Sequence, residues 1–212
     1  MINKYRLNKE AYPLIIVTLA ILIISLLFFK PLAFLSLLAL IIFIVFFRDP
    51  ERNIPEDEKT IVAPADGKIM AIETIYESTF LEQKAYKITI FLSIFNVHIN
   101  RSPIQGKIQD IVYKRGRKFP AFSSKAAELN ESNTIFIKGT KIDLIVRQIA
   151  GIVARRIVCY AKCGDTLQKG ERLGLIKFGS ATEIIIPHDI NIKVAKGDKV
   201  FGGESIIGVI PV

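Results

Sequence analysis

The pattern of hydrophobic and polar positions divides the chain into two parts. Residues 14–29 and 31–47 carry no charge, and only Lys30 separates these two runs. At about 1.5 Å per helical residue each run spans about 25 Å, slightly less than a hydrocarbon core of about 30 Å. Proline suits the first turn of a new helix, so Pro31 marks a turn between two helices. We therefore predict a membrane-associating helical hairpin over residues 1–50.

Basic residues flank the hairpin on both sides, namely Lys4, Arg6, Lys9, Arg48 and Arg52. The positive-inside rule places both flanks on the cytoplasmic side, so we expect the rest of the chain to lie at the cytoplasmic face of the cell membrane. A cleaved signal peptide is the alternative reading of a basic start followed by an apolar run. No small-x-small cleavage site follows the first run promptly, which favours the hairpin.

The sequence after the hairpin is typical of a β-rich domain. Residues 49–59 are rich in proline and charged residues and are interpreted as a linker. Later segments alternate or are rich in β-branched residues, the pattern of strands. The predicted strands cover residues 61–62, 68–75, 87–95, 134–137, 141–146, 173–177, 183–186, 191–194 and 205–209, with a hairpin turn at 138–140 and a helix near 123–129.

An internal similarity refines the fold class. Residues 164–171 (GDTLQKGE) resemble residues 197–204 (GDKVFGGE), and an apolar strand with a glycine follows each. Such paired turns recur in β-sandwiches of the biotinyl or lipoyl carrier type. We predict a mainly β (α+β) fold over residues 51–212, a barrel-sandwich with quasi-duplicated halves. This fold alone indicates no chemistry.

Charge and cysteine content limit the partners. The formal net charge of +9 indicates an anionic partner, either a cytoplasmic membrane leaflet or a nucleic acid. The one dense basic cluster, residues 114–118, matches no nucleic-acid motif, so it is either a solvated loop or a lipid-headgroup contact. Cys159 and Cys163 are too few for a structural zinc site, and His98 and His188 are distant in sequence, so we expect reduced thiols and no metal.

Three residues of the β-rich part could carry chemistry: Asp66, His98 and Ser180. Each alone is a weak signal, but together they supply an acid, a base and a hydroxyl nucleophile. Asp66 would orient the imidazole, and His98 would take the hydroxyl proton. The hydroxyl could attack an external acyl group or its own preceding peptide bond. The second reaction needs backbone freedom before the serine, which Gly179 offers; an acyl shift and β-elimination would then leave a pyruvoyl group at residue 180.

Several motifs in matching order give the β-rich part a family resemblance. It resembles the short phosphatidylserine decarboxylase proenzymes from about Arg48 to the C-terminus. The motifs that carry the resemblance are RDPER at 48–52, PADG at 64–67, NVHINR at 96–101, QIAG at 148–151, ARRI at 154–157, GER at 170–172 and FGS at 178–180.

The resemblance implies a specific function. In that family the residues at the positions of Asp66, His98 and Ser180 drive self-cleavage between residues 179 and 180, giving chains 1–179 and 180–212. The pyruvoyl group made from Ser180 forms a Schiff base with the amine of phosphatidylserine, and carbon dioxide leaves to give phosphatidylethanolamine. The cofactor is covalent, and no metal is required. Arg155 and Arg156 are candidates for the lipid phosphate, since arginine suits phosphate recognition.

The chain departs from the family pattern at a few positions. Longer relatives have a second histidine where this chain has Phe95, so the proton donor for decarboxylation is open. A basic residue usually follows the serine, but here Ala181 does, and Glu183 stands in for a nearby acid. Ser132 replaces an arginine, and His188 has no counterpart and is interpreted as a surface-turn residue.

Two other functions fit the same residues. A noncatalytic membrane adaptor with a barrel-sandwich domain would leave His98 and Ser180 incidental. A membrane serine hydrolase would use them on an external ester or peptide. The substrate's lipid backbone, ester or ether, and the oligomeric state are not determined by the sequence.

Overall fold

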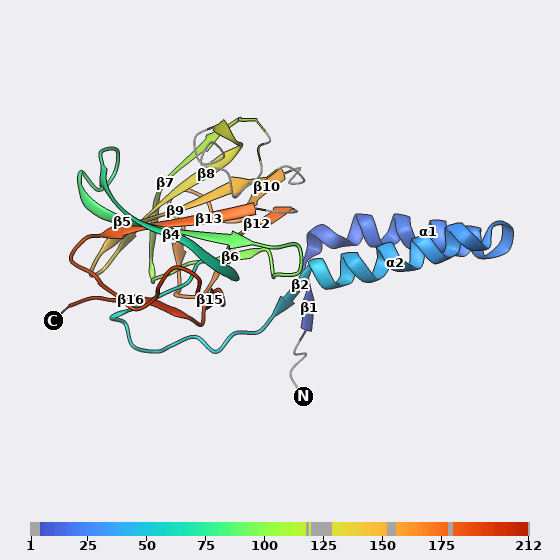
Figure 1. Ribbon diagram of the computed structural model, residues 1–212, viewed down its shortest axis with the longest axis horizontal. Coiled ribbons are helices and arrows are strands. Elements are labelled where there is room, and N and C mark those ends of the chain that lie inside the picture. Colours follow the sequence, from blue (N-terminus) through green and yellow to red (C-terminus); the bar gives the residue numbers. More distant parts are fainter. Residues whose placement is uncertain (1–4, 118, 120–128, 152–155, 178–179, 212) are drawn as a thin grey trace. The chain divides into compact units, whose positions relative to one another are not determined.

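The computed structural model describes residues 5–117, 119, 129–151, 156–177 and 180–211 of the chain. It contains two compact units, Met1–Glu51 and Arg52–Val212 (Figure 1). Each is described separately below.

The first unit is a helical hairpin. A short strand and a turn of 3-10 helix lead into two helices, and a second short strand follows. The elements are β1 (Tyr5–Leu7), η1 (Lys9–Ala11), α1 (Tyr12–Phe28), α2 (Lys30–Phe46) and β2 (Arg48–Pro50). Phe29 breaks the helix with an extended backbone, and Pro31 lies in the first turn of α2. The antiparallel pairing of β1 with β2 closes the base of the hairpin, and the predicted two-helix hairpin is confirmed.

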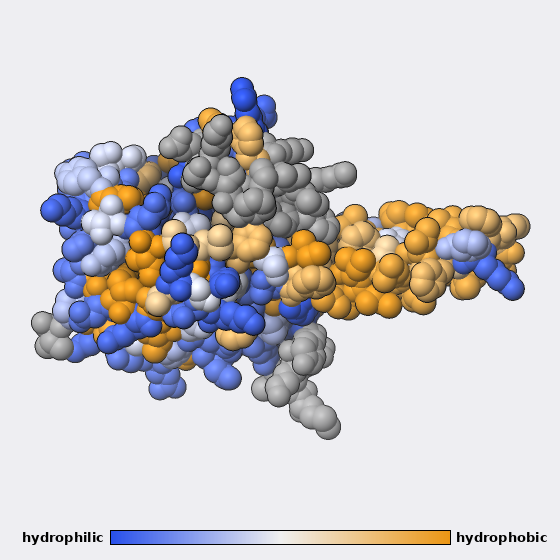
Figure 2. All heavy atoms as spheres, viewed as in Figure 1, coloured by the Kyte–Doolittle hydropathy of each residue, from blue (hydrophilic) through white to orange (hydrophobic). Residues whose placement is uncertain are grey.

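Small side chains lie buried along the hairpin, while most large apolar ones face outward and Phe46 and Phe47 are buried at its base. The hydroxyls of Thr18, Ser25 and Ser36 each donate to a carbonyl of their own helix, at 2.7, 3.0 and 2.8 Å. Small residues let helix backbones approach closely. By contrast, Leu27 and Phe28 are 76 % and 81 % exposed, and Figure 2 shows a hydrophobic surface along both helices. Lys9–Phe28 is long and apolar enough to cross a membrane, and α2 is shorter.

The second unit is built from strands. Its elements are β3 (Thr60–Val62), β4 (Gly67–Glu77), β5 (Gln83–Leu92), β6 (Ile99–Arg101), β7 (Gly106–Lys114), β8 (Ser132–Gly139), β9 (Asp143–Ala150), β10 (Arg156–Cys159), β11 (Thr166–Leu167), β12 (Arg172–Lys177), β13 (Ser180–Pro187), β14 (Asn191–Ile192), β15 (Lys199–Val200) and β16 (Ile206–Val209). One sheet has the order β11-β7-β8-β9-β13-β5-β4-β15, and two small sheets have the orders β10-β12-β6 and β14-β16-β3 (Figure 1). A large apolar core, including Ile88, Val146 and Ile184, lies within this unit, beside smaller clusters around Phe136 and Ile176.

The strand orders show an internal duplication. The large sheet is symmetric about its central β9–β13 pair. On either side of this pair, β8 corresponds to β5, β7 to β4 and β11 to β15. We call β6–β12 the internal repeat, and β3–β5 with β13–β16 the split repeat. Backbone hydrogen bonds repeat as well. The matching pairs are Arg101 N to Pro64 O with Val62 N to Pro103 O, Gly170 N to Ser102 O with Gly203 N to Ala63 O, and Ile108 N to Asp165 O with Ile69 N to Asp198 O, all 2.8–3.0 Å.

The duplication confirms the predicted mainly β fold with quasi-duplicated halves. The two similar turns hold equivalent positions: Gly164 and Gly197 have φ of 94° and 102°, which a residue without a Cβ adopts readily. The predicted strand 87–95 ends instead at Leu92, because Asn96 Oδ1 accepts hydrogen bonds from Ser93 and closes a turn. Strand β7 was not predicted. The helix expected near 123–129 falls mainly on residues 120–128, which lie outside the described part of the chain.

Candidate active site

Asp66 lies in the turn that leads into β4, and a set of donors fixes its carboxylate. Nη2 of Arg52 lies 2.8 Å from both carboxylate oxygens, and the backbone N–H of Gly202 donates to Oδ1 at 2.8 Å. The two side chains are only 7 % and 6 % exposed. Arg52 also contacts Glu204 at 3.3 Å. The carboxylate is thus held rigidly by a cation and a turn of the split repeat.

His98 is fully buried and lies directly before β6, where its carbonyl accepts from Ile176 of β12 at 3.2 Å. Its ring Nδ1 is 2.9 Å from the carbonyl oxygen of Asn96. A carbonyl oxygen only accepts, so Nδ1 carries the hydrogen in this contact and Nε2 is the basic nitrogen of the neutral ring. The Asn96 backbone thus orients the ring through this contact, and the orienting role of Asp66 stays a prediction.

Ser180 is the first residue of β13, the strand at the centre of the large sheet. It pairs with Leu92 of β5 on one side and with Ala150 of β9 on the other. Its side chain is fully buried, and its hydroxyl has no hydrogen-bond partner among the described residues. An unpaired buried hydroxyl costs roughly 1–3 kcal/mol, so a functional reason is expected for it.

One side chain, Asn100 of β6, joins the segments that carry the three predicted residues. Its amide nitrogen donates to Thr182 Oγ1 at 2.9 Å, and Thr182 is two residues after Ser180. The same nitrogen is 3.4 Å from the carbonyl oxygen of Pro64, two residues before Asp66. His98 lies two residues before Asn100. The structure thus brings together strands that are more than 80 residues apart in the chain.

The other predicted residues have different positions. Gly179 and Arg155 lie outside the described residues. Arg156 is exposed at the start of β10, directly opposite Lys177 of β12 in the ladder. Phe95 is 74 % exposed in the turn before His98. His188 follows β13 and stacks on Tyr86, with ring centroids 4.3 Å apart.

Ala181 and Glu183 occupy the face of β13 opposite to Ser180, since side chains alternate along a strand. Glu183 is 2 % exposed, and Arg147 Nη1 lies 3.6 Å from its carboxylate. Burial raises the pKa of Glu183, and the charge of Arg147 partly opposes that shift. Glu183 is therefore buried away from Ser180 and belongs to the outer face of the sheet.

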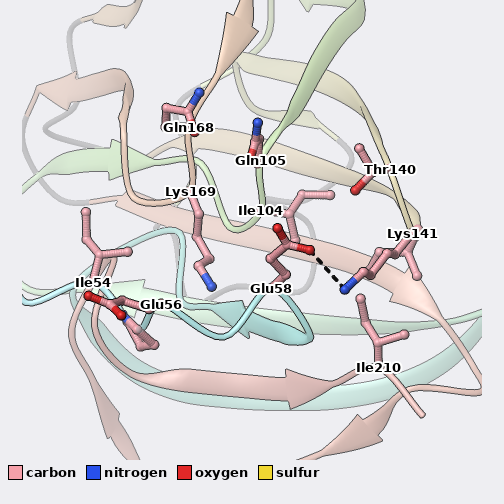
Figure 3. Close-up of a pocket in the computed structure, with 12 residues that line it drawn as sticks. Ile54, Glu56, Glu58, Ile104, Gln105, Thr140, Lys141, Gln168, Lys169 and Ile210 are labelled. Atoms are coloured by element: carbon pink, nitrogen blue, oxygen red, sulfur yellow. Dashed lines mark ion pairs between the residues drawn. The ribbon is translucent and has the colours of Figure 1, made fainter. Parts of the chain in front are cut away.

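A cavity of about 280 Å³ lies at the other end of the large sheet. Asp66, His98 and Ser180 are not among the described residues that line it. Figure 3 shows Lys169 and Lys141 extending toward its interior, with Lys141 paired to Glu58 at 3.1 Å. Lys169 donates to Asp57 O and Thr60 Oγ1 at 2.7 and 3.0 Å, and burial lowers the pKa of this lysine. The ammonium groups of both lysines at the cavity, Lys141 and Lys169, therefore already have partners within the chain.

Neither cysteine supplies a second site. Cys159 is half-buried, and burial raises the pKa of its thiol, while Cys163 is exposed. Within the described residues, no group of three or more His, Cys, Asp or Glu side chains is placed to hold a metal ion.

Sequence reasoning overlooked several residues of this site. Arg52, Asn100 and Gln148 each stood in a family motif but were not predicted as site residues, and neither was Thr182. The available signal was a polar residue inside an apolar β pattern, as at Gln148 and Thr182. That signal alone does not distinguish a site residue from a surface position.

Comparison with known proteins gives a consistent result. The family model for phosphatidylserine decarboxylase matches residues 39–208. The chain is 48 % identical over 180 residues to the phosphatidylserine decarboxylase proenzyme of Carboxydothermus hydrogenoformans, covering 83 % of this chain and 84 % of the relative. It is 47 % identical over 182 residues to that of Desulfotalea psychrophila, covering 84 % of each. A putative archaetidylserine decarboxylase proenzyme of Methanosarcina mazei is 44 % identical over 169 residues, covering 80 % of this chain and 76 % of the relative.

Proposed function

The chain belongs to the phosphatidylserine decarboxylase family, and we propose that it cleaves itself between Gly179 and Ser180 and then decarboxylates phosphatidylserine. The product is phosphatidylethanolamine, which places the enzyme in phospholipid synthesis. The observation that carries the proposal is the buried Ser180 hydroxyl, which has no partner among the described residues and directly follows a glycine in sequence.

Self-cleavage proceeds in steps that balance. The Ser180 Oγ attacks the Gly179 carbonyl carbon, the peptide C–N bond breaks, and an ester forms. Loss of the Ser180 Cα proton then breaks the Cβ–Oγ bond, which leaves a carboxylate on Gly179 and a dehydroalanine at residue 180. Its imine tautomer takes up water and releases ammonia, and a pyruvoyl group remains.

His98 and Asp66 support the attack. The Asn96 carbonyl holds the Nδ1 hydrogen of His98, so Nε2 takes the Ser180 proton as general base. The Asp66 carboxylate is fixed by Arg52 and Gly202, so its negative charge can stabilise the imidazolium without costly reorganisation.

A pyruvoyl group at residue 180 supplies a carbonyl that condenses with the substrate amine and accepts electrons as the carboxylate leaves. The surroundings of Ser180 fit such a group, since the side chain is fully buried and the site around it contains amide and hydroxyl groups that can bind polar atoms.

The two chains produced by cleavage, 1–179 and 180–212, stay associated. Strand β13 belongs to the smaller chain and pairs with strands of the larger chain on both sides. Strand β15 pairs with β4 and strand β16 pairs with β3, so both add ladders between the two chains. Separation would break all of these ladders at once.

The substrate is a membrane lipid, and the apolar helices of the first unit keep the enzyme at the membrane. Basic residues flank the hairpin, so the catalytic unit lies on the cytoplasmic side. Arg155 and Arg156 bind the lipid phosphate, since guanidinium groups match its oxygens. The relatives include both phosphatidylserine and archaetidylserine decarboxylase proenzymes. Carbon dioxide release from vesicles of each lipid identifies the preferred backbone.

Denaturing electrophoresis with mass spectrometry tests the proposal. We expect two chains, the smaller one beginning at residue 180 with a carbonyl in place of an amine. A single intact chain with an ordinary serine would contradict self-cleavage. A serine hydrolase would instead stay whole and react with a fluorophosphonate probe, and a noncatalytic adaptor would stay whole and not react.

A further inference from the structure

A chain of buried side-chain hydrogen bonds crosses the site from β8 to β13. Asn133 Nδ2 donates to Gln148 Oε1 at 3.0 Å, and Gln148 Nε2 donates to Asn100 Oδ1 at 2.8 Å. Asn100 Nδ2 in turn donates to Thr182 Oγ1 at 2.9 Å. All four side chains are at most 2 % exposed. We call these four residues the amide chain.

The fold leaves space for the amide chain at one position. Gly174 of β12 is paired with Asn100 of β6. A Cβ on Gly174 would lie 2.8 Å from Gln148 Nε2 and 2.5 Å from the Val158 carbonyl oxygen. The contact between Gln148 and Asn100 therefore depends on the absence of a side chain at residue 174.

The duplication shows what these positions contain when no chemistry is expected of them. By the repeat equivalence, Asn100 corresponds to Ile61, because Arg101 and Val62 make matching bonds to Pro64 and Pro103. About the central β9–β13 pair, Gln148 corresponds to Ile186 and Thr182 to Leu144. These three apolar counterparts are fully buried members of the core.

The same fold is thus built with apolar side chains at one end and with amides at the other. Burying amides is no better for stability than burying apolar groups of similar size, because their hydrogen bonds to water must first be given up. Once satisfied, however, a buried polar network holds its members in one geometry, whereas apolar contacts allow sliding. The amide chain therefore serves position rather than stability.

We propose that Asn100 is a positioning residue that sets the spacing between the strand of His98 and the strand of Ser180, with Thr182 as its contact on β13. His98 and Asn100 lie on one face of their paired segment, and Ser180 and Thr182 lie on one face of β13. The Asn100–Thr182 bond therefore joins residues that are each two positions from His98 or Ser180 on the same face. This inference rests on the proposed self-cleavage.

The first test is the rate of self-cleavage in the full chain after synthesis, followed by electrophoresis. Thr182→Val keeps the shape of the side chain and removes the oxygen that accepts from Asn100. We expect cleavage to slow about tenfold, the effect of one lost hydrogen bond in a positioned site. Thr182→Ser restores the oxygen and should restore most of the rate, which a purely packing role for the methyl group would not predict. Thr89→Val, on the other face of the sheet, is the matched control and should cleave at the wild-type rate.

The second test replaces three members of the amide chain with the apolar residues that occupy the equivalent positions of the duplicated fold. The triple variant N100I/Q148I/T182L carries the counterpart residues, and we expect it to fold but to cleave about 100-fold more slowly, as expected for a small misplacement of reacting groups. Circular dichroism in detergent checks folding. Cleavage of the folded triple variant at the wild-type rate would overturn the inference. If the triple variant does not fold, wild-type cleavage of Thr182→Val overturns it instead. Failure of the wild-type chain to cleave would contradict the proposed function and with it this inference, whereas wild-type cleavage with unaffected variants would contradict the role of Asn100 alone.

Discussion

The two ends of the large sheet share the same backbone arrangement and differ in the side chains at equivalent positions. The Ser180 end contains Asp66 and the amide chain, and the cavity end contains their counterparts. Asp66 corresponds to Gln105, and both precede the glycine that opens a long strand, Gly67 or Gly106. At the cavity end the interior is apolar, and the lysines that line the cavity pair with Glu58 and with backbone and hydroxyl oxygens.

This difference separates fold from function. Both ends keep the turns with positive φ and the same backbone bonds, so these features specify the fold. Within the described part of the chain, only the Ser180 end combines a buried acid fixed by a cation, a buried histidine and a buried hydroxyl with no partner. Residues that differ between equivalent positions are therefore the ones to test.

The largest effect is expected at Ser180 itself. Ser180→Ala removes the nucleophile, so no second chain should form and no carbon dioxide should be released. Electrophoresis and mass spectrometry measure the first result, and a lipid assay measures the second. Ser132→Ala, at another buried serine, serves as control and should be processed normally. A processed Ser180→Ala chain would remove Ser180 from the mechanism.

The next largest effect is expected at His98. His98→Ala should slow self-cleavage about 10²- to 10⁴-fold, the usual contribution of a general base. Its counterpart in the split repeat is Lys59, and Lys59→Ala should leave the rate unchanged. Normal processing of the histidine variant, followed over time by electrophoresis, would assign the base to another group.

Breaking the clamp on Asp66 should give an intermediate effect. Arg52→Gln leaves a buried carboxylate without its cation, which costs about 3 kcal/mol of unfolding free energy. Self-cleavage should slow as well, because the carboxylate is no longer fixed. Thermal unfolding and the cleavage rate measure the two effects. Glu204→Gln alters the more exposed partner of Arg52 and should change both only slightly; equal effects of the two variants would argue against a specific clamp.

Substitutions at the cavity end should change the free energy of unfolding and not the rate of self-cleavage. Leu144→Asn places an amide among apolar groups and should destabilise the protein by about 3 kcal/mol or more. Gln148→Leu, the polar-to-apolar change at the Ser180 end, should reduce cleavage while costing less stability. Thermal unfolding of both variants compares them directly. A larger stability loss for Gln148→Leu would show that the amide chain is structural.

The smallest effect is expected on the outer face of β13. Burial raises the pKa of Glu183, so the folded protein holds this proton to a higher pH than the unfolded chain does. The contribution of Glu183 to stability is therefore fully present below its ordinary pKa and is lost as pH rises through the raised value. Glu183→Gln should flatten this part of the curve of melting temperature against pH. An unchanged slope would indicate that Glu183 is not the responsible group.

The sequence by itself determined the parts that depend on local pattern. Uncharged runs around Lys30-Pro31 specified a helical hairpin, and alternating β-branched segments specified most strands. The Gly-Asp repeat identified the duplicated fold, because a turn with positive φ needs glycine wherever it occurs. Asp66, His98 and Ser180 were identified by residue type and motif.

Only the tertiary structure decided how these residues are held. The Asn96 carbonyl contacts the His98 ring, and Arg52 holds Asp66. Neither contact follows from a pattern, since each depends on where two segments meet. Strand β7 was missed because polar and charged residues interrupt its apolar positions, and its pairing with β8 supplies the missing stability. The amide chain could not be predicted for the same reason: its members lie on four strands, and their hydrogen bonds form only when β6 of a small sheet packs against β9 and β13 of the large sheet.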